Sequence, residues 1–319
     1  MSKKIIKTEE GPIAIIGIGP IGQMIGAFCY KAGFNLALVD RLPYERVVSH
    51  GIETEGVFQL KTPPMPVYRA LEEIPRKEIG AVVISTKAQT IRGIAKYLNS
   101  ILDRSIPIIV AQNGLDPERW IETEMPGFSY ARLVLNIAGG IRPDGIVHFA
   151  WSQPPNYLGI VGKEIPGWIT ALAEKFTAGG MQTQATNTIR YYAWRKVILN
   201  AALGTICAVT GQTMIDCIED PDSCQIVCAL LDEGIAAAKA DGYDMGEGFK
   251  EKAIAYFKAG GKHKPSILLD LEKGLSTEVD EWNSRIAEVG ISYKLPMTHH
   301  KVAACLIRAM ERKNKPTIH

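Results

Sequence analysis

The sequence has no long hydrophobic run, almost no excess of one charge and few cysteines. No apolar stretch approaches the ~18 residues that a membrane-spanning helix needs. The polar, mixed-charge start of the chain predicts no secretory signal peptide. Lys plus Arg total 36 against 34 for Asp plus Glu, which does not favour a nucleic-acid-binding protein. We therefore expect neither a membrane nor a nucleic acid as a partner.

The few cysteines and histidines do not follow a metal-binding pattern. Cys224 and Cys228 are four residues apart, but no histidine or second cysteine pair lies nearby at zinc spacing. His299 and His300 are adjacent, so on a helix their side chains point about 100° apart. We expect no bound metal and interpret the cysteines as small buried hydrophobic residues of a cytoplasmic, reducing environment. The six are Cys29, Cys207, Cys217, Cys224, Cys228 and Cys305.

The length of 319 residues suits two domains, and the first half of the chain alternates strand-like with helix-like segments. Such alternation predicts βαβ units and a parallel sheet. A glycine-rich stretch over residues 133–149 predicts an extended hairpin. The expected strands are Pro12–Gly17, Asn35–Asp40, Ala81–Ser85 and Pro107–Ala111, and the expected helices are Ile21–Ala32 and Thr90–Leu102.

The second half carries long helical patterns separated by glycine and proline. We therefore predict an α/β protein, with a Rossmann-type domain over residues 1–187 and an all-α domain over residues 188–319. The expected helices of the second domain are Tyr191–Leu203, Ser223–Asp241, Glu247–Ala259, Val279–Val289 and Met297–Arg312.

A glycine fingerprint near the N-terminus predicts a dinucleotide site. It matches G-x-G-x-x-G, follows an apolar strand and opens a helix, and Asp40 ends the next strand 18 residues after Gly22. The first glycine permits a tight turn, the second lets the backbone approach a pyrophosphate, and the third lets helix and strand pack closely. The helix N-terminus then offers free N–H groups to the phosphates. The expected contacts are Gly17, Ile18, Gly19, Pro20, Ile21 and Gly22.

Asp40 and Arg41 favour different cofactors. The Asp40 carboxylate can accept hydrogen bonds from ribose hydroxyls and would repel the 2′-phosphate of NADP, whereas the Arg41 guanidinium would attract that phosphate. Arg41 can equally be an ordinary surface charge. The residues alone leave NADP(H) and NAD(H) both open.

The glycine fingerprint and several further motifs resemble those of the ketopantoate reductase (2-dehydropantoate 2-reductase) family. The resemblance extends over nearly the whole length of the chain. The order and spacing of the second-domain residues carry most of the specificity. The matching positions are the glycine fingerprint, Lys87 in Ser-Thr-Lys-Ala-Gln, Gln112-Asn113-Gly114, Trp194-Arg195-Lys196 with Asn200, and Pro265-Ser266 with Asp270, Glu278 and Asp280.

The resemblance implies reduction of 2-dehydropantoate by NAD(P)H, and it implies a role for each matching residue. Lys196 matches the proton donor, and Glu278 an acidic residue close to nicotinamide and substrate. Asn200 and Ser266 match substrate contacts. The remaining matches are Asn113 beside both cofactor and substrate, Lys87 as a cofactor contact, and Arg41 as the residue that favours NADP. A small 2-oxo acid is the implied partner, and a homodimer stays open.

The chemistry fits Lys196, because hydride transfer to a ketone leaves negative charge on oxygen, which an ammonium stabilises and protonates. Asn200 lies four residues on, so both side chains share a helix face. Simpler interpretations exist for each position. Lys196 can be a solvated lysine, Ser266 a helix N-cap, and Glu278 a first-turn acid in a capping box with Thr277.

The chain also departs from the family pattern. Gly204 stands where the family often has a second Asn, Leu269 where it usually has Gln, and His263 where it can have Asn. Two alternatives therefore remain: a reductase of another small 2-oxo acid, and a non-catalytic dinucleotide-sensing protein of the same fold. The intact Lys196 and Glu278 argue against the sensor, which has no need of a proton donor.

Overall fold

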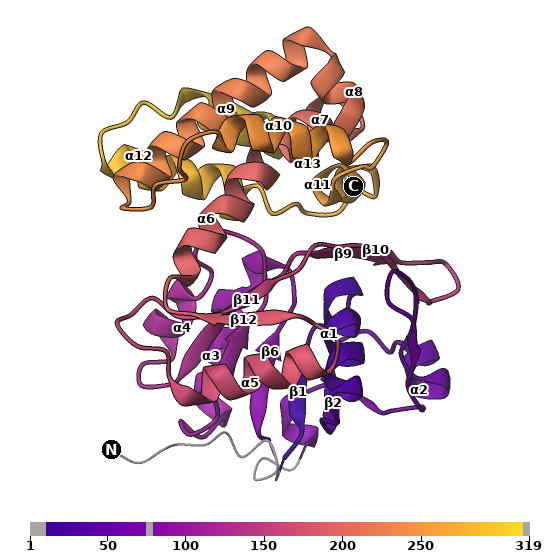
Figure 1. The fold of residues 1–319 in the computed structure, drawn as a ribbon. Helices are drawn as coiled ribbons and strands as arrows, with labels where there is room; N and C mark the ends of the chain where they lie inside the picture. Colours follow the sequence, from indigo (N-terminus) through magenta and orange to yellow (C-terminus); the bar gives the residue numbers. More distant parts are fainter. Residues whose placement is uncertain (1–10, 75–78, 315–319) are drawn as a thin grey trace. The chain divides into compact units, whose positions relative to one another are not determined.

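The computed structural model describes residues 11–74 and 79–314, and the chain divides into two compact units (Figure 1). The first takes in the chain up to Gln112 together with Pro117–Ile189. The second takes in Asn113–Asp116 and the chain from Arg190 onward. The first unit is α/β with a mostly parallel sheet and the second is helical, so the predicted fold class is confirmed. In the described ranges no helix combines the length and apolar character that spanning a membrane requires.

An eight-stranded sheet forms the centre of the first unit. Every neighbouring pair of strands is parallel except β8 and β11. The chain order reverses at β1, which pairs with β2 on one side and β6 on the other, so a topological switch point lies at the carboxyl ends of these strands. The spatial order is β12 (Thr183–Thr186), β11 (Asn156–Gly159), β8 (Tyr130–Val134), β7 (Ile108–Val110), β6 (Ala81–Ile84), β1 (Ile13–Ile16), β2 (Leu36–Val39) and β5 (Val67–Tyr68).

Alternating side chains of the buried strands build a hydrophobic layer on each face of this sheet. Ile13 and Ile15 belong to a cluster that includes residues of α1 (Pro20–Lys31) and α5 (Gly167–Ala178). Ala14 belongs to a separate cluster with residues of α3 (Ile91–Ile101) and α4 (Arg119–Glu124). This period of two is the one that a strand buried on both faces requires. Short helices α2 (Glu45–His50), η1 (Leu71–Glu73) and η3 (Ala88–Thr90) complete the unit.

A second, four-stranded sheet packs beside α1. Its order is β4 (Leu60–Lys61), β3 (Glu53–Gly56), β10 (Val147–Ser152) and β9 (Ile137–Ile141). The antiparallel pair β9–β10 is the hairpin that the glycine-rich stretch predicts. Phe149 of β10 meets Phe28 of α1 edge-on, with ring centroids 5.4 Å apart.

The helical unit is built around one long helix with an irregular middle. The α6 segment (Ile189–Leu199) runs through the π-helical turn η4 (Asn200–Gly204) into α7 (Thr205–Thr210). A second π-helical turn, η5 (Asp280–Ser284), leads into α12 (Arg285–Ser292). The remaining helices are α8 (Met214–Glu219), α9 (Pro221–Ala240), α10 (Phe249–Ala259), α11 (Ser266–Glu272) and α13 (Thr298–Asn314).

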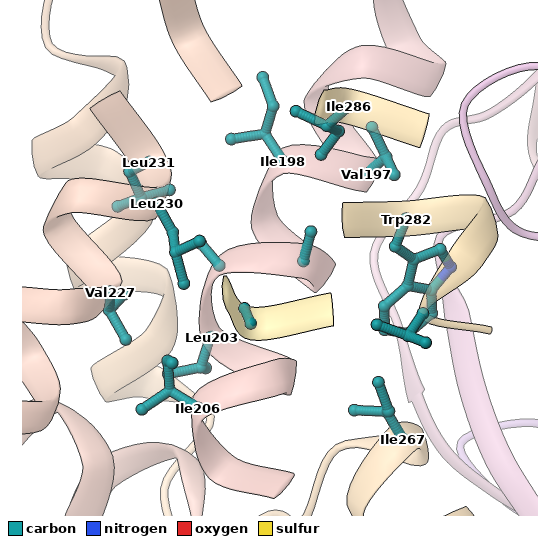
Figure 2. Packing of buried hydrophobic residues seen from close by; sticks show 14 of the residues in the cluster. Val197, Ile198, Leu203, Ile206, Val227, Leu230, Leu231, Ile267, Trp282 and Ile286 are labelled. Carbon is teal, nitrogen blue, oxygen red and sulfur yellow. The ribbon is translucent and has the colours of Figure 1, made fainter. Parts of the chain in front are cut away.

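One apolar core holds these helices together (Figure 2). Ile198 and Leu203 of the long helix face this core together with Leu230 of α9, and Trp282 of η5 contributes the largest of the labelled side chains. Burying each aliphatic side chain contributes about 1.5–3 kcal/mol. The predicted helices are present, but neither π-helical turn was predicted. A π-helical turn has one residue more than an α-helical turn, and the spacing of apolar residues does not distinguish the two.

The prediction that the cysteines are small buried residues is only partly correct. Cys29, Cys207 and Cys217 are buried, and burial raises the pKa of the Cys29 thiol. Cys224 and Cys228 of α9 are half-buried, and Cys305 of α13 is exposed.

Candidate functional site

The glycine fingerprint forms an open turn between β1 and α1. Gly17 has a φ of 88°, which favours glycine. A Cβ atom on Gly22 would lie 2.0 Å from the Gly17 carbonyl oxygen, so only glycine lets the helix pack here. A Cβ atom on Gly19 would meet no atom within 4 Å. The turn therefore leaves free space beside Gly19 at the N-terminus of a 12-residue helix, as a bound pyrophosphate requires.

Asp40 links the end of β2 to this turn. Its Oδ2 accepts a hydrogen bond from the Ile18 N–H at 2.8 Å, and its Oδ1 accepts one from the Leu42 N–H at 3.0 Å. The sequence prediction considered only a ribose as partner for this carboxylate. The geometry adds a structural task, because the carboxylate also fixes the backbone of the residue between the first two glycines.

Arg41 is exposed directly after Asp40, and a second arginine lies against it. The Arg69 guanidinium donates to the Arg41 carbonyl oxygen. Arg69 follows β5, the edge strand that pairs with β2. Two cations therefore lie at the carboxyl ends of neighbouring parallel strands. Sequence reasoning missed Arg69, because only the pairing of β5 with β2 brings it to this position.

Lys87 lies in the loop after β6, with an exposed side chain. Its carbonyl oxygen accepts hydrogen bonds from the Thr90 N–H at 3.0 Å and from the Gln112 Nε2 at 3.1 Å. The neighbouring Ser85 hydroxyl donates to the Gly17 carbonyl at 2.7 Å. Hydrogen bonds thus join the loops that follow β1, β2 and β6 at the carboxyl ends of these strands, which is where dinucleotides bind in such folds. The supporting role of Gln112 was not predicted.

In the helical unit, the structure brings together two predicted site residues that are far apart in sequence. Asn113 Nδ2 donates to Glu278 Oε2 at 3.3 Å across a separation of 165 residues. Glu278 is buried, with 7% of its surface exposed. The Leu115 N–H donates to the Glu281 carbonyl at 3.3 Å and fixes the two segments alongside each other.

Asp116 anchors the Asn113 segment. Its buried carboxylate accepts hydrogen bonds from Arg285 Nε at 2.9 Å and Nη2 at 2.8 Å, and from Arg190 Nη1 at 3.2 Å. The bidentate bond to Asp116 raises the pKa of Arg285. Sequence reasoning missed Asp116, although an acidic residue three positions after Asn113 was visible.

The other predicted residues lie on three elements of the same unit. Lys196 in α6 and Asn200, the first residue of η4, are both half-buried. Ser266 is the exposed first residue of α11, directly after the N-cap residue Pro265. The interpretation of Ser266 as an N-cap is therefore wrong, since Pro265 occupies that position.

The capping box proposed around Glu278 is also absent. Glu278 precedes the π-helical turn η5, whose N-cap is Val279, so it is not a first-turn acid. The Thr277 hydroxyl donates to Glu311 Oε1 and accepts from the Val279 N–H at 3.4 Å, while the Thr277 N–H, which a capping box would use, also donates to Glu311 Oε1, at 2.6 Å. The Glu278 carboxylate accepts a hydrogen bond from the side chain of Asn113, which lies on a distant segment.

Gly204 lies in apolar surroundings. A Cβ atom at this position would be 3.2 Å from Ile267 Cγ2, 3.5 Å from Trp282 Cζ3 and 3.8 Å from Pro265 Cβ. A Cβ atom at residue 204 would be tight against Ile267 and in ordinary contact with the other two, so a polar side chain there would lie among apolar groups. The Gly204 end of the η4 turn is therefore apolar, whereas Asn200 at its start is polar.

Among residues 11–74 and 79–314, no group of three His, Cys, Asp or Glu side chains is placed to hold a metal ion.

A parallel sheet with a glycine turn at its switch point, followed by a helical unit, defines a dinucleotide-binding protein of the dehydrogenase type. The chain belongs to the ketopantoate reductase PanE/ApbA family, a family of NAD(P)-dependent oxidoreductases. The model of its N-terminal part matches residues 13–161, and the model of its C-terminal part matches residues 188–311.

Curated relatives match along almost the whole chain. The 2-dehydropantoate 2-reductase of Aquifex aeolicus is 28% identical over 313 residues, covering 94% of this chain and 97% of the relative. The 2-dehydropantoate 2-reductase of Archaeoglobus fulgidus is 24% identical over 303 residues, with the same coverage.

Solved structures share the fold at low identity. A 2-dehydropantoate 2-reductase from Methylococcus capsulatus superposes with a TM-score of 0.85 at 22% identity, covering 96% of this chain and 99% of that one. D-mandelate dehydrogenase in complex with NADH and anilino(oxo)acetate superposes with a TM-score of 0.82 at 20% identity, covering 95% and 99%. The fold is thus shared by structures described as acting on different substrates.

Proposed function

We propose that this protein reduces 2-dehydropantoate to (R)-pantoate with NAD(P)H, a step in pantothenate and coenzyme A biosynthesis. The observation that carries the proposal is the hydrogen bond between Asn113 and Glu278. Both residues match family positions near substrate and cofactor, and they meet although 165 residues separate them. The curated relatives from Aquifex aeolicus and Archaeoglobus fulgidus, both named 2-dehydropantoate 2-reductase, add support.

The dinucleotide is held by the first unit in this proposal. The turn Gly17–Gly22 takes the pyrophosphate, and the space beside Gly19 fits that group. Asp40 and Arg41 contact the adenosine end, and Lys87 contacts the cofactor from the loop after β6. When bound, NAD(P)H supplies a hydride to the carbonyl carbon of the substrate.

The side chains of the helical unit handle the substrate and the proton. The Lys196 ammonium polarises the 2-oxo group and gives a proton to its oxygen as negative charge develops there. Asn200 and Ser266 hold the substrate. Glu278 accepts a hydrogen bond from the substrate hydroxyl, and Asn113 fixes the direction of that carboxylate while lying beside the cofactor.

A second candidate is a reductase of a 2-oxo acid with an apolar side chain. The surroundings of Gly204 favour it, because Ile267 and Trp282 fill the space where a second polar side chain would otherwise stand four residues after Asn200. The D-mandelate dehydrogenase structure, which shares the fold, contains an aromatic 2-oxo acid analogue.

A substrate pair that differs by one hydroxyl tests both candidates. The assay compares 2-dehydropantoate with 3,3-dimethyl-2-oxobutanoate, which lacks only the hydroxyl, using NADPH and NADH in turn. We expect kcat/KM to be at least ~10-fold higher for 2-dehydropantoate. A site built to bind the substrate hydroxyl disfavours an analogue without it, because the polar groups of the site then lack a hydrogen-bond partner. A preference for the deoxy analogue or for phenylglyoxylate supports the second candidate. No turnover of any 2-oxo acid contradicts both and leaves a dinucleotide-sensing protein.

A further inference from the structure

The two π-helical turns of the helical unit carry or adjoin proposed site residues. The turn η4 begins at Asn200, and η5 begins two residues after Glu278. A π-helical turn contains one extra residue and is less favourable than an α-helical turn, so it needs local support.

The side chain of Asn283 connects the two turns. Asn283 lies in η5, is fully buried, and donates from Nδ2 to the Ala201 carbonyl oxygen in η4 at 3.1 Å. The Thr205 hydroxyl donates to the same carbonyl from the following turn of the long helix. Two side-chain donors therefore converge on one carbonyl of the π-helical turn, directly after Asn200.

His300 fixes the orientation of the Asn283 amide. The imidazole is fully buried, and its Nε2 lies 3.0 Å from the Leu230 carbonyl oxygen, which requires a hydrogen on Nε2. The His300 Nδ1 is then an acceptor, 3.3 Å from Asn283 Nδ2. The tautomer follows from this network of bonds. The amide nitrogen thus has three acceptors within reach for its two hydrogens: the Ala201 carbonyl, His300 Nδ1 and, at 3.4 Å, the Thr205 hydroxyl.

We propose that Asn283 is a positioning residue, which holds the π-helical turn that presents Asn200 and sets its place relative to the segment of Glu278. This inference rests on the proposed substrate contact of Asn200. Without the amide, the Ala201 carbonyl keeps only the Thr205 hydroxyl as a side-chain donor, and the buried His300 Nδ1 loses the donor that faces it, which is costly. The turn then relaxes toward regular α-helix, which rotates the residues before it relative to those after it.

A double-mutant cycle tests this role. The variants are Asn283→Ala, Asn200→Ala and the double variant, assayed for kcat/KM with the preferred 2-oxo acid and for the dissociation constant of NAD(P)H by nucleotide fluorescence. We expect Asn283→Ala alone to lower kcat/KM by about 10- to 100-fold, the size of effect that a small misplacement causes. The dissociation constant of the dinucleotide should change less than about twofold. In the Asn200→Ala background, Asn283→Ala should cause no further loss, because coupled residues are not additive.

The control is Phe257→Leu, which loosens the same core from α10 without touching the network. This variant should lower the melting temperature and leave kcat/KM unchanged. If Asn283→Ala behaves like this control, or if its loss multiplies fully with that of Asn200→Ala, the positioning role is wrong. If Asn283→Ala does not fold, Asn283→Leu removes the amide donor with a smaller change in volume, and unchanged kcat/KM in that variant also overturns the role. An Asn200→Ala variant with full activity would instead remove Asn200 from the proposed site, a result distinct from failure of Asn283 alone.

Discussion

Asn113 donates a hydrogen bond to the buried carboxylate of Glu278, and its place depends on Asp116, three residues further along the chain. Asp116 is bound by both Arg285 and Arg190. Ion pairs outside the proposed reacting groups therefore hold the segment that carries a proposed substrate contact.

Removing the charge of Asp116 should disturb both stability and activity. Asp116→Asn removes the buried carboxylate that two arginines share, leaving Arg190 with Asp241 and Arg285 with the exposed Glu288. Breaking a buried pair typically costs about 3–5 kcal/mol. We expect a loss of about 3 kcal/mol in the free energy of unfolding, measured by denaturant titration, together with a fall in kcat/KM. Glu288→Gln removes the exposed partner of the same Arg285 and should change stability by less than about 1 kcal/mol. Equal effects in the two variants would contradict the anchoring role.

The space beside Gly19 should decide dinucleotide binding. Gly19 has a φ of −62°, and a Cβ atom there meets nothing, so Gly19→Val should fold normally while its side chain occupies the phosphate site. We expect loss of NAD(P)H binding in a fluorescence titration with an unchanged melting temperature. Gly140→Val in β9 is the matched control, because its Cβ atom is also unobstructed. Unaltered binding in Gly19→Val would refute the site.

Cofactor choice should respond to Arg41 and Asp40 in opposite directions. Arg41→Ala should raise the KM for NADPH more than that for NADH, since it removes a partner of the 2′-phosphate. Asp40→Asn should improve NADPH relative to NADH, because the amide oxygen can still accept from the Ile18 N–H while the negative charge is gone. Alanine at residue 40 would instead loosen the turn and confuse the two effects. An unchanged ratio of kcat/KM values in both variants means that neither residue reads the adenosine end.

Protonation of His300 should destabilise the helical unit in acid. Burial lowers the pKa of His300 from 6.5 to about 4, against the attraction of Glu233 and with a small repulsion from His299. The unfolded chain therefore binds a proton that the folded chain does not, so stability is complete above pH 6.5 and is lost as pH falls toward 4. The loss amounts to about 3 kcal/mol. His300→Gln keeps a donor and an acceptor but does not titrate, and the stability difference between wild type and this variant should follow that pH window. A difference independent of pH would contradict the assignment.

The sequence predicted the features that depend on local pattern. Alternating apolar segments located the strands around the glycine turn, and the spacing between Gly22 and Asp40 followed from strand and helix lengths. Lys196 and Asn200 were named from the family resemblance, and their spacing of four residues predicted only that they share a helix face.

What the sequence could not show depends on contacts between distant segments. Arg69 reaches Arg41 only through the pairing of β5 with β2. Asp116 is bound by Arg285, which lies 169 residues away in the sequence. Asn283 binds a carbonyl of a π-helical turn, and the spacing of apolar residues does not predict such a turn. The capping box at Thr277 is absent for the same reason, because Glu311 of a distant helix accepts the Thr277 N–H that the box would use.

The most direct test of the account is the single-turnover rate of Lys196→Ala with a saturating 2-oxo acid and NAD(P)H. Removing the general acid should lower this rate by roughly 10²- to 10⁴-fold. The dissociation constant of the dinucleotide should hardly change, because the glycine turn belongs to the other unit. Arg195→Ala, which removes the neighbouring exposed cation, should keep the wild-type rate. A Lys196→Ala enzyme that retains more than about a tenth of the wild-type rate would contradict the proton-donor role.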